Sequence, residues 1–114
     1  MPLTPNDNID AASLVLSHKE LPASAVVDGQ PTTGWARLGE NFGREIGVWE
    51  ITEGTATDVE VDEVFVVIAG RGRIEFSEPA LAPIDLAPGR VVKLKAGAHT
   101  RWIVAETLRK FVIL

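Results

Sequence analysis

The sequence predicts an all-β domain, a sandwich or barrel built from many short strands. Two observations lead to this prediction. Ten glycines and seven prolines are spread over 114 residues and separate short apolar runs, which is the pattern of strands joined by tight turns. No segment has the regular apolar spacing of a helix of three turns, because in the one candidate, residues 8–17, that spacing is irregular.

The first part of the chain is read as an arm followed by turns. Residues 1–13 hold two prolines and several Asp and Asn residues, so we expect an N-terminal arm and a single domain over residues 14–114. The strands are expected, in order, at residues 14–16, 34–38, 45–52, 63–69, 71–77, 90–95, 100–105 and 108–114.

The run at residues 63–69 is the strongest strand signal, Glu-Val-Phe-Val-Val-Ile-Ala. Alternation places Glu63, Phe65 and Val67 on one face. The short link Ala69-Gly-Arg-Gly72 indicates a hairpin to the next strand. Because the opposite face of this run is also apolar, the strand needs cover on both sides, which predicts a homodimer.

Charge and composition exclude several classes of function. The net charge is −5, with scattered basic residues, so nucleic acid is not expected as a partner. The longest apolar run, residues 64–69, is too short to cross a membrane. The chain has no cysteine, which excludes disulfides and thiolate metal sites. The N-terminus shows no secretory signal, and a cytoplasmic location is expected.

Two motifs carry a family resemblance. Glu63 is followed by six residues and Gly70, and Pro88-Gly89 is followed by Arg-Val-Val-Lys-Leu-Lys-Ala-Gly97. These segments resemble the first and second motifs of the cupin superfamily, with Lys95 where proline is usual. The resemblance implies a cupin-type jelly-roll barrel, also called a double-stranded β-helix or RmlC-like fold.

A closer resemblance covers residues 45–114. The segments that carry it are Gly47-Val-Trp-Glu50, Asp62-Glu63, Trp102 and Arg109-Lys110-Phe-Val-Ile113. They are similar to small single-domain cupins related to the ethanolamine-utilisation protein Q and to ureidoglycine aminohydrolase.

Metal-binding cupins commonly use two histidines and a glutamate from the first motif and one histidine from the second. Counted from the motifs, these positions fall on Thr57, Val59, Glu63 and Thr100, and only Glu63 has a matching side chain. We therefore expect no metal residues and no cofactor, although a divalent cation is possible. The acidic residues Glu60, Asp62 and Glu63 are either solvated charges or oxygen ligands for a hard cation.

Several residues are candidates for the pocket. Glu63 starts the most apolar strand, so it is either an acid or base with a raised pKa or one partner of a salt bridge with Lys110, Arg101 or Arg109. Lys110 lies in an apolar strand and needs a carboxylate or a wet cavity. Glu63 and Lys110 are the candidate catalytic residues, and the candidate ligand-binding residues are Trp49, Glu63, Thr100, Trp102 and His99.

His99 is either a surface histidine near a turn or a pocket residue, and Trp35 is expected to pack on the outer face. His18 is given no role.

Three functions are compatible with these residues. The first is binding of a small polar metabolite in the barrel, as a sensor or accessory domain. The second is an enzyme acting on a small nitrogen-containing metabolite, which the aminohydrolase resemblance implies. The third is a structural protein whose barrel is filled by Trp49 and Trp102. Missing metal histidines favour the first, and a carboxylate paired with an ammonium inside the pocket would favour the second.

Overall fold

The computed structural model describes residues 2–114, and apart from one short 3-10 helix the regular structure of this part of the chain is all β strand. The elements are β1 (His18–Glu20), the 3-10 helix η1 (Ala23–Ala25), β2 (Val26–Gly29), β3 (Thr32–Asn41), β4 (Arg44–Ile51), β5 (Gly54–Val59), β6 (Glu63–Glu78), β7 (Ile84–Leu86), β8 (Val91–Leu94) and β9 (His99–Ile113). The all-β prediction is confirmed. No helix among residues 2–114 has the length and apolar character needed to span a membrane.

The long strands β6 and β9 organise the fold. They pair with each other antiparallel along their length, and the other strands add to one half or the other. The first half of β6 also pairs with β8, and the second half of β9 with β4, which continues to β3 and β1. The second half of β6 also pairs with β7, and the first half of β9 with β5 and then β2.

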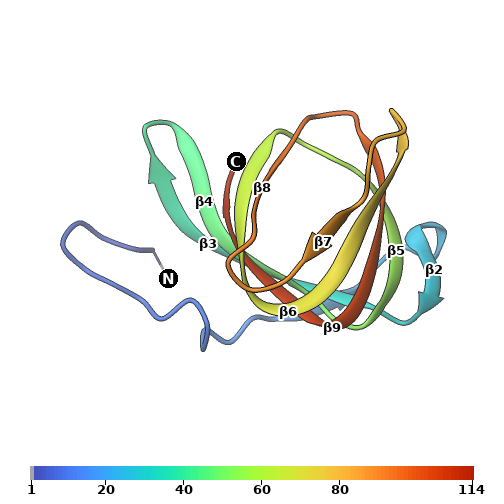
Figure 1. The fold of residues 1–114 in the computed structure, drawn as a ribbon. Helices are drawn as coiled ribbons and strands as arrows, with labels where there is room; N and C mark the ends of the chain where they lie inside the picture. The colour runs from blue at the N-terminus through green and yellow to red at the C-terminus, as the bar shows by residue number, and fades with distance from the viewer. Residues whose placement is uncertain (1) are drawn as a thin grey trace.

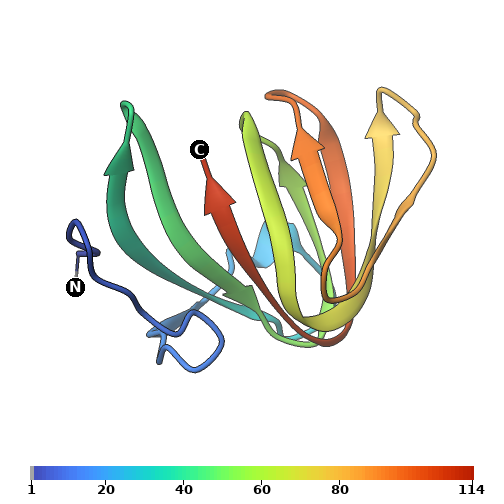
Figure 2. The same cartoon turned by 60° about the vertical axis from the view of Figure 1, so that its left-hand side comes forward.

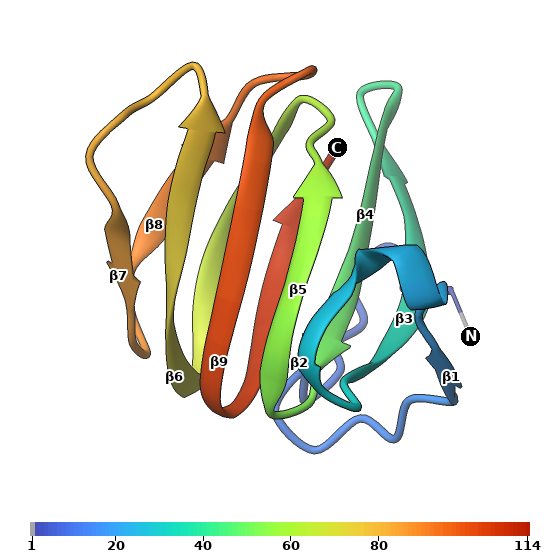
Figure 3. The ribbon, with the colours of Figure 1, turned by 90° about the vertical axis from the view of Figure 1, so that its right-hand side faces the viewer.

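Two curved sheets result, joined by the bends of β6 and β9. Figure 2 shows the sheet that runs from β3 through β4 and β9 to β6 and β8, and Figure 3 looks onto the sheet from β7 through β6, β9 and β5 to β2. Both sheets curl around a common interior, as a jelly roll requires (Figure 1).

The hairpin expected at Ala69-Gly-Arg-Gly72 does not form. The two strands expected on either side of it are the halves of β6, and both pair with β9. Gly70 has a φ of 91°, which favours glycine, and a Cβ on Gly72 would lie 2.6 Å from the Ile103 carbonyl oxygen. The glycines therefore allow a bulged bend between sheets rather than a reversal of direction. Likewise, the strands expected at 100–105 and 108–114 are one strand, β9.

Other boundaries also differ. Residues 14–16 are not a strand, and β1, β2, β5 and β7 form where none was expected. These four strands are short, and β5 has the sequence Gly-Thr-Ala-Thr-Asp-Val with little apolar alternation. Its pairing with β9 decides its conformation, because strand propensity depends mainly on neighbouring strands.

The interior holds the main apolar core, and the expected alternation of β6 is confirmed. Glu63, Phe65 and Val67 are buried, whereas Val64 is exposed. Phe65, Ile74 and Trp102 belong to the core cluster between the sheets. The core thus lies directly below the charged residue that begins β6.

A second apolar cluster lies outside the barrel, on the outer face of β3 and β4. It is formed by Leu16, Leu38 and Val48, and Leu3 and Ile9 from the N-terminal segment pack against it. The Leu3 amide also donates a hydrogen bond to the Leu38 carbonyl at 2.7 Å. The N-terminal segment therefore covers part of the outer sheet face, while the expected domain boundary at residue 13 stays a prediction.

Candidate functional site

A cavity of about 270 Å³ lies at the end of the barrel where β5 runs into β6 and where β9 ends. Its lining combines aromatic and charged side chains from β3, β4, β5, β6 and β9. The residues that line it are Trp35, Glu45, Trp49, Asp58, Val59, Glu60, Val61, Glu63, Trp102, Lys110, Val112 and Leu114. All three tryptophans of the chain are among them.

Glu63 and Lys110 form a buried ion pair at the base of this cavity. Glu63 is the first residue of β6, and Lys110 lies on the neighbouring half of β9. Lys110 Nζ donates to Glu63 Oε1 at 2.6 Å, and the two side chains are 8% and 7% exposed. Of the three cationic partners that remained open from the sequence, the structure selects Lys110.

Aromatic rings surround the Lys110 ammonium. Its Nζ lies 4.4 Å from the ring centroid of Trp49, 4.3 Å from that of Phe65 and 4.8 Å from that of Trp102, distances that are typical of cation–π contacts. Burial lowers the pKa of Lys110 below its ordinary value, and the attraction of Glu63 opposes that shift. The site therefore holds an ammonium ion by one carboxylate and three ring faces.

Glu60 is a second buried carboxylate of the cavity. Its Oε2 accepts hydrogen bonds from Thr100 Oγ1 at 2.5 Å and from Trp102 Nε1 at 2.9 Å. The Glu60 amide donates to the Ala98 carbonyl, which ties the β5–β6 connection to the turn before β9. Two donors and the backbone thus fix the Glu60 carboxylate in place.

The acidic residues before β6 therefore separate into two groups. Glu60 and Glu63 are 5% and 9% exposed, whereas Asp62 is exposed and accepts a hydrogen bond from the Ala96 amide. Among residues 2–114, no group of three or more His, Asp or Glu side chains has the arrangement of a metal site. The absence of a tightly held transition metal stays a prediction, which elemental analysis of the purified protein tests.

Asp58 is a third carboxylate on the inner face of β5. It is paired in register with Thr100 on β9 and lines the cavity at its edge. Desolvation by the surrounding protein and repulsion from Glu60 raise the pKa of Asp58. The Asp58 side chain nevertheless stays exposed to water at the edge of the cavity.

The register of β5 differs from the one counted from the motif. Thr57 and Val59, on which the motif count places the two histidine positions, are exposed and lie opposite Arg101 and His99. Asp58 faces inward instead. A shift of one residue exchanges the two faces of a strand, and the pairing of β5 with β9 sets the register here.

A family model for the EutQ-like cupin domain matches residues 38–111, well over half of the chain. The chain belongs to the EutQ-like cupin family. None of the curated proteins matches it.

Solved structures with similar folds include several cupins. A protein of unknown function from Pseudomonas syringae pv. tomato aligns with a TM-score of 0.76 and 20% identity, over 94% of this chain and 46% of that one. The EutQ protein of Clostridium difficile aligns with a TM-score of 0.65 and 18% identity, over 93% and 83%. A cupin superfamily protein from Desulfitobacterium hafniense aligns with a TM-score of 0.63 and 12% identity, over 98% and 92%. The chain thus spans less than half of the Pseudomonas protein, and at these identities the likeness establishes the cupin fold.

In this EutQ-like cupin, four of the expected pocket residues lie together. Trp49, Glu63, Trp102 and Lys110 all line the cavity. The rings of Trp49 and Trp102 meet edge to face with centroids 5.4 Å apart. Thr100 is buried just behind this group, where it orients Glu60.

His99 is not brought to this cavity. It is exposed at the start of β9 and lines a separate, more apolar groove of about 660 Å³ that includes Phe76, Leu81 and Ile84. Its role as a ligand-binding residue stays a prediction, and the structure gives it no contact with Glu63 or Lys110.

Trp35, Asp58 and Glu60 are cavity residues that sequence reasoning missed. Trp35 does not pack on the outer face: it is paired in register with Trp49, and it lines the cavity while 39% exposed. A Cβ on Gly47 would collide with the Trp35 ring. The signal for Trp35 was therefore a glycine on the neighbouring strand, which leaves room for a large ring.

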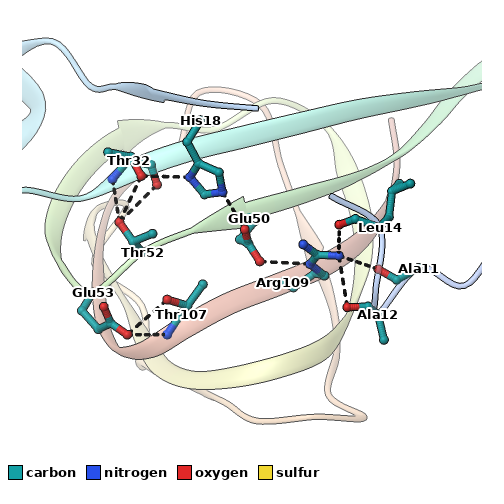
Figure 4. A network of polar contacts seen from close by, with 10 residues as sticks. All are labelled: Ala11, Ala12, Leu14, His18, Thr32, Glu50, Thr52, Glu53, Thr107 and Arg109. Carbon is teal, nitrogen blue, oxygen red and sulfur yellow. Dashed lines mark hydrogen bonds and ion pairs between the residues drawn. The ribbon is translucent and has the colours of Figure 1, made fainter. Parts of the chain in front are cut away.

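Arg109 faces away from the cavity and binds Glu50 and the N-terminal segment. Its Nε donates to Glu50 Oε1 at 3.0 Å, and its Nη1 donates to the carbonyl oxygens of Ala11, Ala12 and Leu14 (Figure 4). His18 approaches the other Glu50 oxygen at 2.6 Å. This network attaches the N-terminal segment to the barrel. The Arg109 side chain thus points away from the cavity, whereas the side chain of its neighbour Lys110 points into it.

Proposed function

We propose that this EutQ-like cupin binds a small polar metabolite in the cavity above Glu63 and Lys110. The observation that carries the proposal is the charged, hydrogen-bonded set of Glu60, Glu63 and Lys110 within a wall of three indole rings. Ligand sites typically combine apolar walls with a few convergent polar groups. A cavity of about 270 Å³ is at the small end of such sites and suits a metabolite of few atoms.

The alternative function is catalysis at the same place. Glu63 and Lys110 are adjacent, and burial lowers the pKa of the Lys110 ammonium, which brings a lysine closer to the range of a general base. The aminohydrolase resemblance suggests a small nitrogen-containing metabolite as substrate. Turnover of a bound compound, lost in Lys110→Met while binding remains, would favour this alternative.

Tryptophan fluorescence provides a direct test of binding. The chain has three tryptophans and no tyrosine, and every tryptophan lines the cavity. We expect a small polar compound from a thermal-shift screen to change this fluorescence in a saturable way. Compounds that raise the melting temperature without changing the fluorescence would bind elsewhere and would contradict the proposed location.

A matched pair of aromatic truncations tests the location further. Trp35→Ala removes a wall at the cavity edge and should weaken binding about three- to tenfold, as expected for loss of one aromatic contact. Phe42→Ala removes a ring that is 99% exposed in the β3–β4 turn and should leave the affinity unchanged. Equal effects of the two variants would place the ligand outside the cavity.

A further inference from the structure

We propose that the ligand of this cavity is a small compound with a primary ammonium group, which donates hydrogen bonds to Glu60. This inference rests on the proposed function and names the class of ligand.

The charge of the cavity favours a cation. Glu45, Asp58, Glu60 and Glu63 contribute four carboxylates to its wall. Glu45 is paired with Arg37, and Glu63 is paired with Lys110, the one ammonium of the lining. Desolvation and, after it, repulsion from Glu60 raise the pKa of Asp58. A bound cation relieves this repulsion, whereas an anion that approaches Lys110 has to pass the carboxylates.

Glu60 has an acceptor oxygen available to a ligand. Its Oε2 takes both hydrogen bonds, from Thr100 and Trp102, and no group among residues 2–114 donates to its Oε1. The residue is 95% buried and lines this cavity. Because no fully buried side-chain oxygen in the described chain lacks a partner, Oε1 of Glu60 keeps some exposed surface, and the cavity that Glu60 lines gives a ligand access to this carboxylate. The second oxygen of this fixed carboxylate can therefore accept a charge-assisted hydrogen bond from an N–H group of a ligand.

The aromatic walls suit an organic cation. Lys110 already demonstrates that an ammonium fits against the faces of Trp49 and Trp102 in this barrel. Trp35, beside Trp49 on the neighbouring strand, also lines the cavity and provides a further ring face for a ligand. A primary ammonium offers N–H donors to Glu60, and a quaternary ammonium of similar size offers none.

Four probes of similar size separate charge from shape: n-butylammonium, 1-butanol, n-butyrate and tetramethylammonium. Each probe is added in increasing concentration to the full chain, and binding is followed by tryptophan fluorescence at constant ionic strength. The pH is about 7.5, at which an alkyl ammonium is charged. We expect n-butylammonium to bind at least about tenfold more tightly than 1-butanol and tetramethylammonium, because one charge-assisted hydrogen bond changes the affinity by at least that factor. We expect n-butyrate not to bind.

Glu60→Gln is the decisive variant. The amide oxygen can keep the hydrogen bonds from Thr100 and Trp102, while an NH2 group replaces the open oxygen. We expect n-butylammonium affinity to fall at least about tenfold while the circular dichroism spectrum and the affinity for any neutral ligand stay the same. Glu106→Gln makes the same charge change at an exposed position outside the cavity and should have no effect.

The outcomes separate this inference from the proposed function. Tighter binding of 1-butanol or n-butyrate than of n-butylammonium overturns the ammonium inference and leaves the cavity as a binding site. Equal binding of tetramethylammonium, or unchanged affinity in Glu60→Gln, removes the role of N–H donation to Glu60. If no probe binds, the ammonium inference falls, and the proposed function falls with it only if the broader screen also finds no ligand.

Discussion

The Lys110 ammonium lies 2.6 Å from Glu63 Oε1 inside the barrel, with more than nine-tenths of each side chain removed from water. Such a pair has lost the hydration of both charges, so each partner depends on the other. The pair connects β6 and β9, the two strands that carry the fold. The same contact therefore affects both the stability of the domain and the chemistry of its cavity.

Glu63→Gln should lower the free energy of unfolding by about 3–5 kcal/mol, because it leaves the Lys110 ammonium buried without a counter-charge. Urea unfolding at neutral pH measures the change, with Glu106→Gln as the exposed control. The double variant Glu63→Leu with Lys110→Met should recover most of the loss, since well-packed apolar residues can replace a buried ion pair. A loss below about 1 kcal/mol in Glu63→Gln would contradict the dependence of Lys110 on Glu63.

Asp58→Asn should make the protein more stable at pH 7 and equally stable in acid. The pKa of Asp58 is raised in the folded state, so its contribution is fully favourable below the ordinary pKa of 3.8 and is lost as the pH rises through the raised pKa. The gain at pH 7 should be below about 1 kcal/mol, because water partly screens this side chain. Urea midpoints between about pH 3 and pH 7 test the sign, and a variant that is less stable at pH 7 would contradict it.

Arg109→Lys should loosen the N-terminal segment without changing ligand binding. Lysine keeps the charge but cannot reproduce the planar fork by which Arg109 binds Glu50 and the carbonyl oxygens of Ala11, Ala12 and Leu14. Hydrogen exchange of residues 2–17 should become at least about tenfold faster, which corresponds to about 1.4 kcal/mol of local stability. Exchange that accelerates equally in β6 would indicate a global rather than a local effect.

We expect the protein to be a homodimer that uses the outer face of β6 and β8. Val64, Val91 and Ile113 are 37%, 66% and 42% exposed on this face, where Val64 is paired in register with Ile113. Light scattering at micromolar concentration should give twice the mass of the chain, and Val64→Lys with Val91→Lys should give the mass of one chain. A single-chain mass for the unmodified protein would refute this interface.

The faces of the strongest strand could be predicted from local sequence. Alternation placed Glu63 on the same face as Phe65 and Val67, and the structure buries all three. The glycine and proline spacing likewise predicted an all-β domain, and the resemblance of two motifs implied the cupin type. These features depend on neighbouring residues in the chain, whose side chains alternate by backbone geometry alone.

The bend of β6 could not be predicted from the local sequence, because glycines such as Gly70 and Gly72 permit either a hairpin or a bulged turn between sheets. Pairing of both halves of β6 with β9 selects the bend. The same pairing continues to β5, where the register with β9 turns Asp58 inward and Thr57 outward.

Sequence by itself determined that a carboxylate enters the barrel at Glu63 and that a lysine in an apolar strand needs a partner. Only the tertiary structure decided that the partner is Lys110 rather than Arg109, because consecutive residues on β9 face opposite sides, one toward the cavity and one toward Glu50. It also decided that Glu60 is buried, since Thr100 and Trp102, forty or more residues later, supply its hydrogen bonds. Contacts between distant segments set the energy of a buried charge, and no local pattern encodes them.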